Sequence, residues 1–327
     1  MAPSSAVDVI VPCYNYGRFL RAAVESALPR DGRPVRILVI DDQSSDETPE
    51  VASALAACYP NVTWRRHAVN AGHHATYNEG LAWARSPYLV LLSADDMLAP
   101  GALSRAAAFL DRHPEVGMVY GRTRAFYGEP PDIPPPPGAP STVIPGLDFV
   151  RVASVHAYNP IDNPASVMVR TDLQHRLGGY RDELPHAGDM EMWLRFGLHA
   201  PVGFLDVEQG LYRRHDDNMS LGYRSLGDYT QRLLVWTTLC DRYPDRLPDG
   251  PALVDRVKRA LAAEIFARSC EAFERGTPAD LSDCLRLAAS LDPAMRRTRA
   301  WWTLGIKRLL GRPLSAAIAR IHDPVTS

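Results

Sequence analysis

The stretch VDVIVPCYNYGRFLRAAVESAL, residues 7–28, decides the fold, because an apolar run ends in polar residues and leads directly into an amphipathic segment. Short apolar runs of this kind recur up to residue 127 and alternate with helical patterns. Such alternation is typical of β-α-β units around a largely parallel sheet. It predicts a doubly wound α/β domain. The predicted strands are 9–11, 37–40, 62–64, 88–92 and 118–120, and the predicted helices are 19–28, 48–57, 77–84 and 101–112.

Prolines interrupt this pattern at PPDIPPPPGAP, residues 130–140, which we predict to be a loop because proline fixes φ and lacks an amide donor. The α/β pattern then resumes, and from about residue 224 the pattern is helical. We therefore predict an α/β domain over 1–223 and an appended helical region over 224–327. The later predicted elements are strands at 166–169, 202–205 and 210–213, and helices at 190–198, 228–241, 252–275, 279–290 and 299–310.

Composition narrows the class of protein. The 327 residues are 46% hydrophobic and carry a formal net charge of -2, so no global positive field is available to hold nucleic acid. The five cysteines are widely spread without a CxxC pair, which predicts reduced thiols. No run approaches the roughly 18 apolar residues of a membrane span, and we expect a cytoplasmic protein.

Polar residues follow the first two predicted strands, where ligands bind in an open parallel sheet. Tyr14 can stack on a nucleotide base, and Asp42 can accept a hydrogen bond from its ring. Asn15 lies in the same stretch and belongs to the predicted nucleotide site. A structural alternative stays open, because Asn15 and Ser45 or Asp46 are also good N-cap residues for the helices that follow.

Two adjacent acids, Asp95 and Asp96, follow the apolar run at 88–92. Two unpaired carboxylates at such a position are costly unless a cation or hydroxyl groups partner them. A divalent metal that also grips a diphosphate meets this need. The alternative is a surface turn in which Asp96 caps the helix that starts near Pro100.

Two further positions can carry chemistry. Asp189 lies in the first turn of a predicted helix, where the helix dipole favours an ionised carboxylate that can act as a general base. His215 follows a strand-like run and can supply an imidazole ligand to a metal. The alternatives are an acidic first turn without chemical significance and an ordinary surface or core histidine.

Taken together and in this order, these stretches resemble the inverting glycosyltransferases of family 2, which have the GT-A fold. The resemblance covers roughly residues 7–220. The segments that carry it are residues 7–28, ILVIDDQSSDET (37–48), NAGHHATYNEGL (70–81), YLVLLSADDMLAPGAL (88–103), GDMEMWLR (188–195) and YRRH (212–215).

The resemblance implies a donor site for a nucleotide-diphosphate sugar, with a UDP-sugar favoured. The family's base contacts are matched by Pro12, Tyr14 and Asp42, and the segment that borders the nucleoside is matched by Asn70 and Gly72. Asp95 matches the acid that faces the ribose, and Asp96 matches the ligand of Mn²⁺ or Mg²⁺. His215 matches a residue near the metal and diphosphate, and Asp189 matches the general base. The implied reaction is transfer with inversion to a hydroxyl of a glycan, a lipid-linked glycan or a small molecule.

The sequence departs from the family pattern at two positions. Tyr77 stands where the family often has arginine, and Gly188 stands where a glutamate commonly precedes the base. There is no QxxRW segment, so we expect non-processive transfer. The main alternative is a non-catalytic protein that keeps the fold and binds nucleotide sugars. A dinucleotide-dependent oxidoreductase is disfavoured because no GxGxxG turn follows the first strand.

The segment RRTRAWWTLGIKRLLGR, residues 296–312, mixes tryptophan and leucine with six basic residues. This composition can lie on an anionic membrane surface. The alternative is an amphipathic helix packed on the catalytic domain with its arginines in water. The sequence does not predict an oligomeric state.

Overall fold

The structure is a computed structural model that describes residues 5–29, 31–134, 136, 138–219, 226–277 and 281–311. It divides into two compact units. The first contains Met1–Ala153 and Asn159–Arg224, and the second contains Ser154–Tyr158 and Ser225–Ser327. The predicted boundary between residues 223 and 224 lies outside the described residues.

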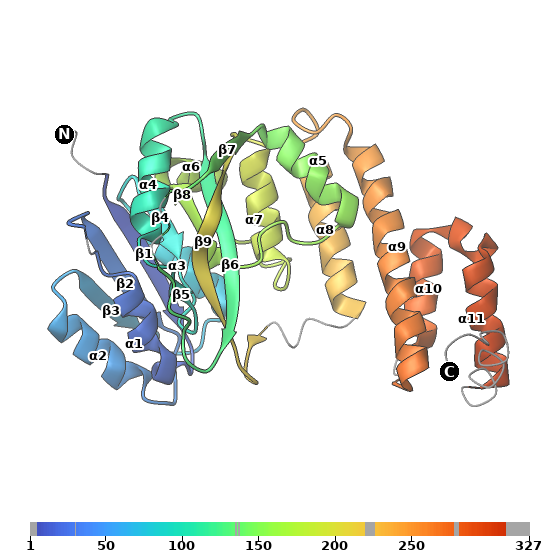
Figure 1. Ribbon diagram of the computed structural model, residues 1–327, viewed down its shortest axis with the longest axis horizontal. Helices are drawn as coiled ribbons and strands as arrows, with labels where there is room; N and C mark the ends of the chain where they lie inside the picture. Colours follow the sequence, from blue (N-terminus) through green and yellow to red (C-terminus); the bar gives the residue numbers. More distant parts are fainter. Residues whose placement is uncertain are drawn as a thin grey trace. The chain divides into compact units, whose positions relative to one another are not determined.

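One mixed sheet organises the first unit (Figure 1). Its order over the described residues is β3-β2-β1-β4-β8-β6-β9-β5, and β7 pairs with β9. Strands β3, β2, β1 and β4 run parallel, whereas β8 is antiparallel to both of its neighbours. The strands are β1 (Val7–Cys13), β2 (Val35–Asp41), β3 (Val62–Arg66), β4 (Tyr88–Leu91), β5 (Met97–Leu98), β6 (Met118–Tyr127), β7 (Ser141–Ile144), β8 (Val167–Arg170) and β9 (Val202–Arg214).

Helices cover both faces of this sheet, which confirms the doubly wound prediction. On one face, Val9 and Val11 belong to a buried cluster with residues of α1 (Gly17–Ser26), α2 (Thr48–Cys58) and α4 (Ala102–Arg112). On the other face, Ile10 packs against α3 (His73–Trp83), where a Cβ on Gly80 would lie 2.2 Å from Ile10 Cγ2. Alternating side chains of one strand therefore serve two helical layers.

The first unit also contains elements that sequence patterns did not predict. These are β5, β7, α5 (Gly146–His156), the 3₁₀ turn η1 (Pro164–Ser166) and α6 (Thr171–Leu177), whereas α7 (Gly188–Gly197) matches a predicted helix. The described residues of 130–140 form neither helix nor strand, as predicted.

The strands predicted at 202–205 and 210–213 are one continuous strand, β9. The residues between them, 206–209, include two acids. In the structure, Asp206 pairs with Arg122 and Glu208 with Arg124 on the neighbouring β6, so these charges are accommodated within the sheet. A register shift between Gly121 and Thr123 lets the pairing continue along the whole strand.

The second unit is helical, which confirms the predicted C-terminal helices (Figure 1). Phe273, Leu281, Leu285 and Leu304 form a buried cluster in it. No helix in the described ranges is long and apolar enough to cross a membrane. The elements are α8 (Leu226–Arg242), α9 (Gly250–Arg275), α10 (Leu281–Leu291), η3 (Pro293–Arg297) and α11 (Arg299–Leu310).

Candidate functional site

A cavity of about 620 Å³ lies in the first unit, where β1, β2 and β4 end. Parallel strands bring their carboxyl ends to one edge, so the residues that follow them meet there. Eight of the ten predicted site residues line this cavity, and Asn15 and His215 do not. The eight are Pro12, Tyr14, Asp42, Asn70, Gly72, Asp95, Asp96 and Asp189.

The buried Asp42 fixes the loop that begins α3. Its Oδ1 accepts a hydrogen bond from the backbone N of Ala71 at 2.7 Å, and its Oδ2 accepts one from Gly72 N at 2.9 Å. Asn70 Nδ2 donates to the Asp42 carbonyl oxygen at 3.3 Å. The predicted nucleoside segment is therefore held against the acid that follows β2.

His67 is a site residue that sequence reasoning missed. It follows β3, beside β2 in the sheet, and its Nδ1 lies 2.7 Å from Asp42 Oδ1. Its Nε2 lies 2.8 Å from Glu79 Oε2 on α3. Its place just past a strand end was the available signal, but a single histidine there carries no recognisable motif.

Burial lowers the pKa of His67, but hydrogen bonds to the carboxylates of Asp42 and Glu79 outweigh it and raise the pKa above its ordinary value. The charged ring therefore stabilises the fold fully below pH about 6.5, and this contribution is lost as pH rises through the raised pKa. We expect His67→Gln to lower the melting temperature more at pH 6 than at pH 9. A difference in melting temperature between the wild type and His67→Gln that grows with pH would contradict this expectation.

Tyr14 and Asn15 have separate roles in the loop after β1. Tyr14 is 49% exposed and lines the cavity, so its ring can stack on a ligand. Asn15 has a φ of 57°, its Oδ1 accepts from Ser45 N at 2.8 Å, and its N donates to Ser44 Oγ at 2.9 Å. Asn15 thus joins the loops after β1 and β2 behind the cavity lining.

Asp95 and Asp96 are both buried at the end of β4. Asp96 Oδ1 accepts from the backbone N of Arg213 at 3.0 Å, and Asp96 Oδ2 accepts from Asn163 Nδ2 at 2.7 Å. Burial raises the pKa of both carboxyls, and the charge of Asp95 raises the pKa of Asp96 further. A cation beside the pair would relieve both effects.

His215 supports Asp95 from outside the cavity lining. The backbone N of Asp217 donates to His215 Nδ1 at 3.2 Å, so the ring proton lies on Nε2, which is 3.2 Å from Asp95 Oδ2. The ring therefore orients Asp95 in this arrangement. Among the described residues, no group of three or more His, Cys, Asp or Glu side chains is placed to hold a metal ion.

Asp189 lies in the first turn of α7 and lines the same cavity. Its Oδ1 accepts a hydrogen bond from the hydroxyl of Tyr180 at 2.8 Å. Tyr180 is itself held by Asn78 of α3, whose Oδ1 accepts from Tyr180 N at 2.7 Å and whose Nδ2 donates to Tyr180 O at 3.0 Å. Burial raises the pKa of Asp189, although the Tyr180 hydroxyl and His73 oppose the shift.

An aromatic cluster beside Asp189 explains the departure at Gly188. A Cβ at this position would lie 2.8 Å from His74 Nε2 and 2.9 Å from Tyr180 Cδ1, so no side chain fits. The Tyr77 ring packs against Tyr180 and His73 at centroid distances of 5.2 and 5.6 Å. Burial and the charge of His73 lower the pKa of His74 to about 4, so this ring is neutral at pH 7.

Comparison with known proteins gives a family match for part of the first unit. Residues 8–154 match the family described as Glycosyl transferase family 2. An uncharacterised protein of Mycobacterium bovis is 28% identical over 71% of this chain, and the chain spans 64% of the length of that relative.

Two solved structures share the fold. TarS of S. aureus (residues 1–349), in complex with UDP-GlcNAc, aligns with a TM-score of 0.58 and 17% identity over 89% of this chain and 91% of that one. The mannosyltransferase PcManGT of Pyrobaculum calidifontis, in complex with GDP-Man and Mn²⁺, aligns with a TM-score of 0.53 and 19% identity over 97% of this chain and 87% of that one. The first unit therefore has the GT-A fold.

Proposed function

Because residues 8–154 match glycosyltransferase family 2, we propose that this chain transfers a sugar from a nucleotide-diphosphate sugar to an acceptor hydroxyl. The observation that carries the proposal is that Asp95, Asp96 and Asp189 line one cavity at the carboxyl ends of the parallel strands. The first two acids suit a diphosphate with its metal, and the third suits an incoming hydroxyl.

The donor in this proposal is a nucleoside-diphosphate sugar, with a UDP-sugar favoured. The base stacks on the exposed ring of Tyr14, and Pro12, Asp42 and the loop at 70–72 border the nucleoside. The bound UDP-GlcNAc of TarS and the bound GDP-Man of PcManGT support this class of ligand and leave the base and the sugar open.

The buried acids suit a divalent metal such as Mn²⁺ or Mg²⁺. Asp96 would hold it, because each of its oxygens has one protein donor and keeps a second lone pair, and hard cations choose carboxylate oxygens. Asp95, next to it, would face the donor ribose. When bound, the metal would neutralise charge on the leaving diphosphate. His215 would act through Asp95 by fixing the orientation of its carboxylate.

Asp189 is the proposed general base. Its carboxylate takes the proton of the acceptor hydroxyl as that oxygen attacks the anomeric carbon and the bond to the diphosphate breaks. A single displacement of this kind inverts the anomeric configuration and needs no sugar-enzyme intermediate. Tyr180 positions the base by donating to one oxygen, which leaves the other for the acceptor.

Tyr180→Phe tests this positioning role. Removing the hydroxyl donor destabilises the ionised form of Asp189, so its pKa, already raised, rises further. A hydrogen bond to a charged group stabilises it by roughly 1.5–3 kcal/mol, so we expect the acidic limb of the kcat/KM profile to move up by about one pH unit or more. A profile that keeps its midpoint while the rate falls at every pH would contradict a role through Asp189.

Turnover tests the proposed activity itself. Purified protein with Mn²⁺ or Mg²⁺ would be incubated with a panel of nucleotide sugars, and release of the nucleoside diphosphate would be measured. Thermal shift with the same panel reports binding independently, because a ligand of the folded state raises the melting temperature. Donor binding without hydrolysis or transfer from any sugar would identify a non-catalytic nucleotide-sugar-binding protein instead.

A further inference from the structure

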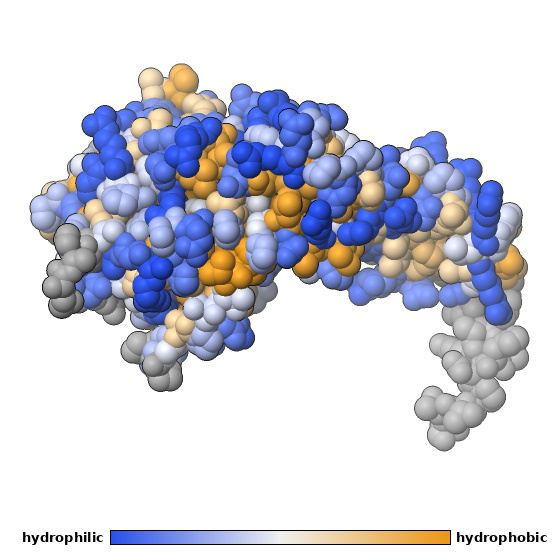
Figure 2. Space-filling view, turned by 90° about the horizontal axis from the view of Figure 1, so that it is seen from above, coloured by the Kyte–Doolittle hydropathy of each residue, from blue (hydrophilic) through white to orange (hydrophobic). Residues whose placement is uncertain are grey.

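The outer side of α11 is apolar and exposed. Trp302 is 64% exposed, Ile306 56%, Leu309 90% and Leu310 40%. Their spacing of four, three and one residues places them on one side of the helix. Figure 2 shows apolar surface next to strongly hydrophilic surface on the helices of this unit, at the right of the view.

The opposite side of α11 anchors the helix to its own unit. Leu304 is buried in the cluster with Leu285 of α10 and Phe273 of α9. The Trp301 ring stacks on Phe266 of α9 at a centroid distance of 5.7 Å. The amphipathic helix that the sequence predicted therefore packs through Trp301 and Leu304, and its outer apolar side makes no contribution to this core.

Basic residues flank the apolar side, and one of them, Lys307, forms an ion pair with Glu274 of α9 at 3.2 Å. Residues 293–311 contain five arginines or lysines and no acid, in a chain whose formal net charge is -2. The five are Arg296, Arg297, Arg299, Lys307 and Arg308. Arg312, the last residue of the predicted basic segment, lies outside the described residues.

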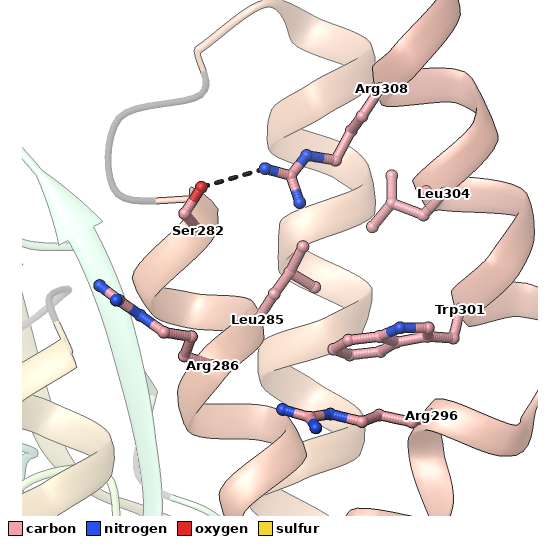
Figure 3. Close-up of a pocket in the computed structure, with 8 residues that line it drawn as sticks. Ser282, Leu285, Arg286, Arg296, Trp301, Leu304 and Arg308 are labelled. Atoms are coloured by element: carbon pink, nitrogen blue, oxygen red, sulfur yellow. Dashed lines mark hydrogen bonds between the residues drawn. The ribbon is translucent and has the colours of Figure 1, made fainter.

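Three arginines also line a groove of about 350 Å³ between α10 and α11, and no acidic side chain lines it within the described part of the chain. Figure 3 shows Arg296 and Trp301 extending into this groove toward Leu285, with Arg308 donating to Ser282 Oγ at 3.0 Å. The third arginine is Arg286. Guanidinium groups beside an apolar floor suit a phosphate that is attached to an acyl chain.

We propose that α11 binds the surface of a membrane that contains anionic lipids. Trp302, Ile306 and Leu309 enter the boundary between headgroups and acyl chains, and the arginines of η3 and α11 meet lipid phosphates. Charge complementarity favours an anionic membrane over a second copy of α11, because two copies would bring like charges together. The membrane contact does not depend on the proposed activity. A lipid-linked acceptor for that activity rests on the proposed function.

Vesicle sedimentation of the full-length protein tests the proposal. The vesicles are phosphatidylcholine alone or phosphatidylcholine with phosphatidylglycerol. We expect binding to the anionic vesicles that weakens as salt is added. Trp302→Ser combined with Leu309→Ser should reduce this binding more than about tenfold, because two large apolar side chains no longer enter the membrane. Arg296→Glu combined with Arg299→Glu should remove the preference for anionic lipid.

Tyr127→Ser is the matched control, because Tyr127 is a 79% exposed aromatic residue of the first unit. Absent binding, or equal binding by all variants, would overturn the proposal. If the protein is a dimer and the Trp302 and Leu309 substitutions dissociate it, the apolar face binds a second copy instead. If the protein binds vesicles only after residues 312–327 are deleted, the face binds the chain's own C-terminus. Release of nucleoside diphosphate in the absence of vesicles should be the same for every variant, so a failed activity assay and a failed vesicle assay are distinguishable.

Discussion

Asp189→Asn is expected to lower kcat for sugar transfer by about 10²–10⁴-fold and to leave donor affinity nearly unchanged. Asparagine has the same shape as aspartate and still accepts the hydrogen bond of Tyr180, but it cannot take a proton from the acceptor. The rate would be measured with a nucleotide sugar that supports turnover, and donor affinity by calorimetry.

The matched control for this substitution is Asp182→Asn, which removes an exposed acid of the same segment that does not line the cavity. It should keep the wild-type rate. Equal losses of rate and of donor affinity in Asp189→Asn would show that this residue supports donor binding and would remove its assignment as the base.

Asp96→Asn is expected to lower the rate by about 10³-fold and to cost clearly more than Asp95→Asn, because a metal contributes several kcal/mol to the transition state. The structural reason is the surroundings of Asp96. Its two oxygens face two donors, Arg213 N and Asn163 Nδ2, so an amide NH₂ meets a donor whichever way it turns. At Asp95, the described side-chain donors, His215 and Asn218, both face Oδ2, and an asparagine oxygen can still accept there.

Titration of the rate with Mn²⁺ would separate a metal defect from a folding defect. Asp96→Asn should need more metal than the wild type and more than Asp95→Asn, and the melting temperatures of both variants without metal would be compared. Asp206→Asn, at a half-buried acid of β9 outside the cavity, should behave like the wild type. A larger loss for Asp95→Asn than for Asp96→Asn would reverse the assignment.

The parallel half of the fold could be predicted because each of its strands is a local signal. The runs at 9–11 and 37–40 are apolar on both faces, which reflects a sheet covered by helices on both sides. The position of strand β8 in the sheet could not be predicted. It pairs with β4 and β6, and nothing in its sequence, VMVR, specifies those partners. The two residues of β5 are too few to form a pattern.

Some residues of the site could be predicted in the same way, and others could not. Asp42, Asp95 and Asp96 follow strands, so their meeting at one edge is a consequence of topology that the sequence already contains. Tyr180 acts through a partner far along the chain, because it is held by Asn78, 102 residues earlier. Contacts of this kind arise only when the chain is folded, and one sequence offers no pattern for them.

In the proposed mechanism, the length of helix α3 sets the distance between the donor nucleoside and the general base. Its N-terminal end is tied to Asp42 at Gly72, beside the nucleoside, and its middle holds Tyr180, and through it the base, at Asn78. An α-helix is a stiff rod with a fixed rise and rotation for each residue. One residue added between these two points would turn Asn78 by about 100° away from Tyr180. The proposed site therefore depends on the number of residues between Gly72 and Asn78, and an insertion there should separate Asp189 from its support while leaving the Asp42 contacts in place.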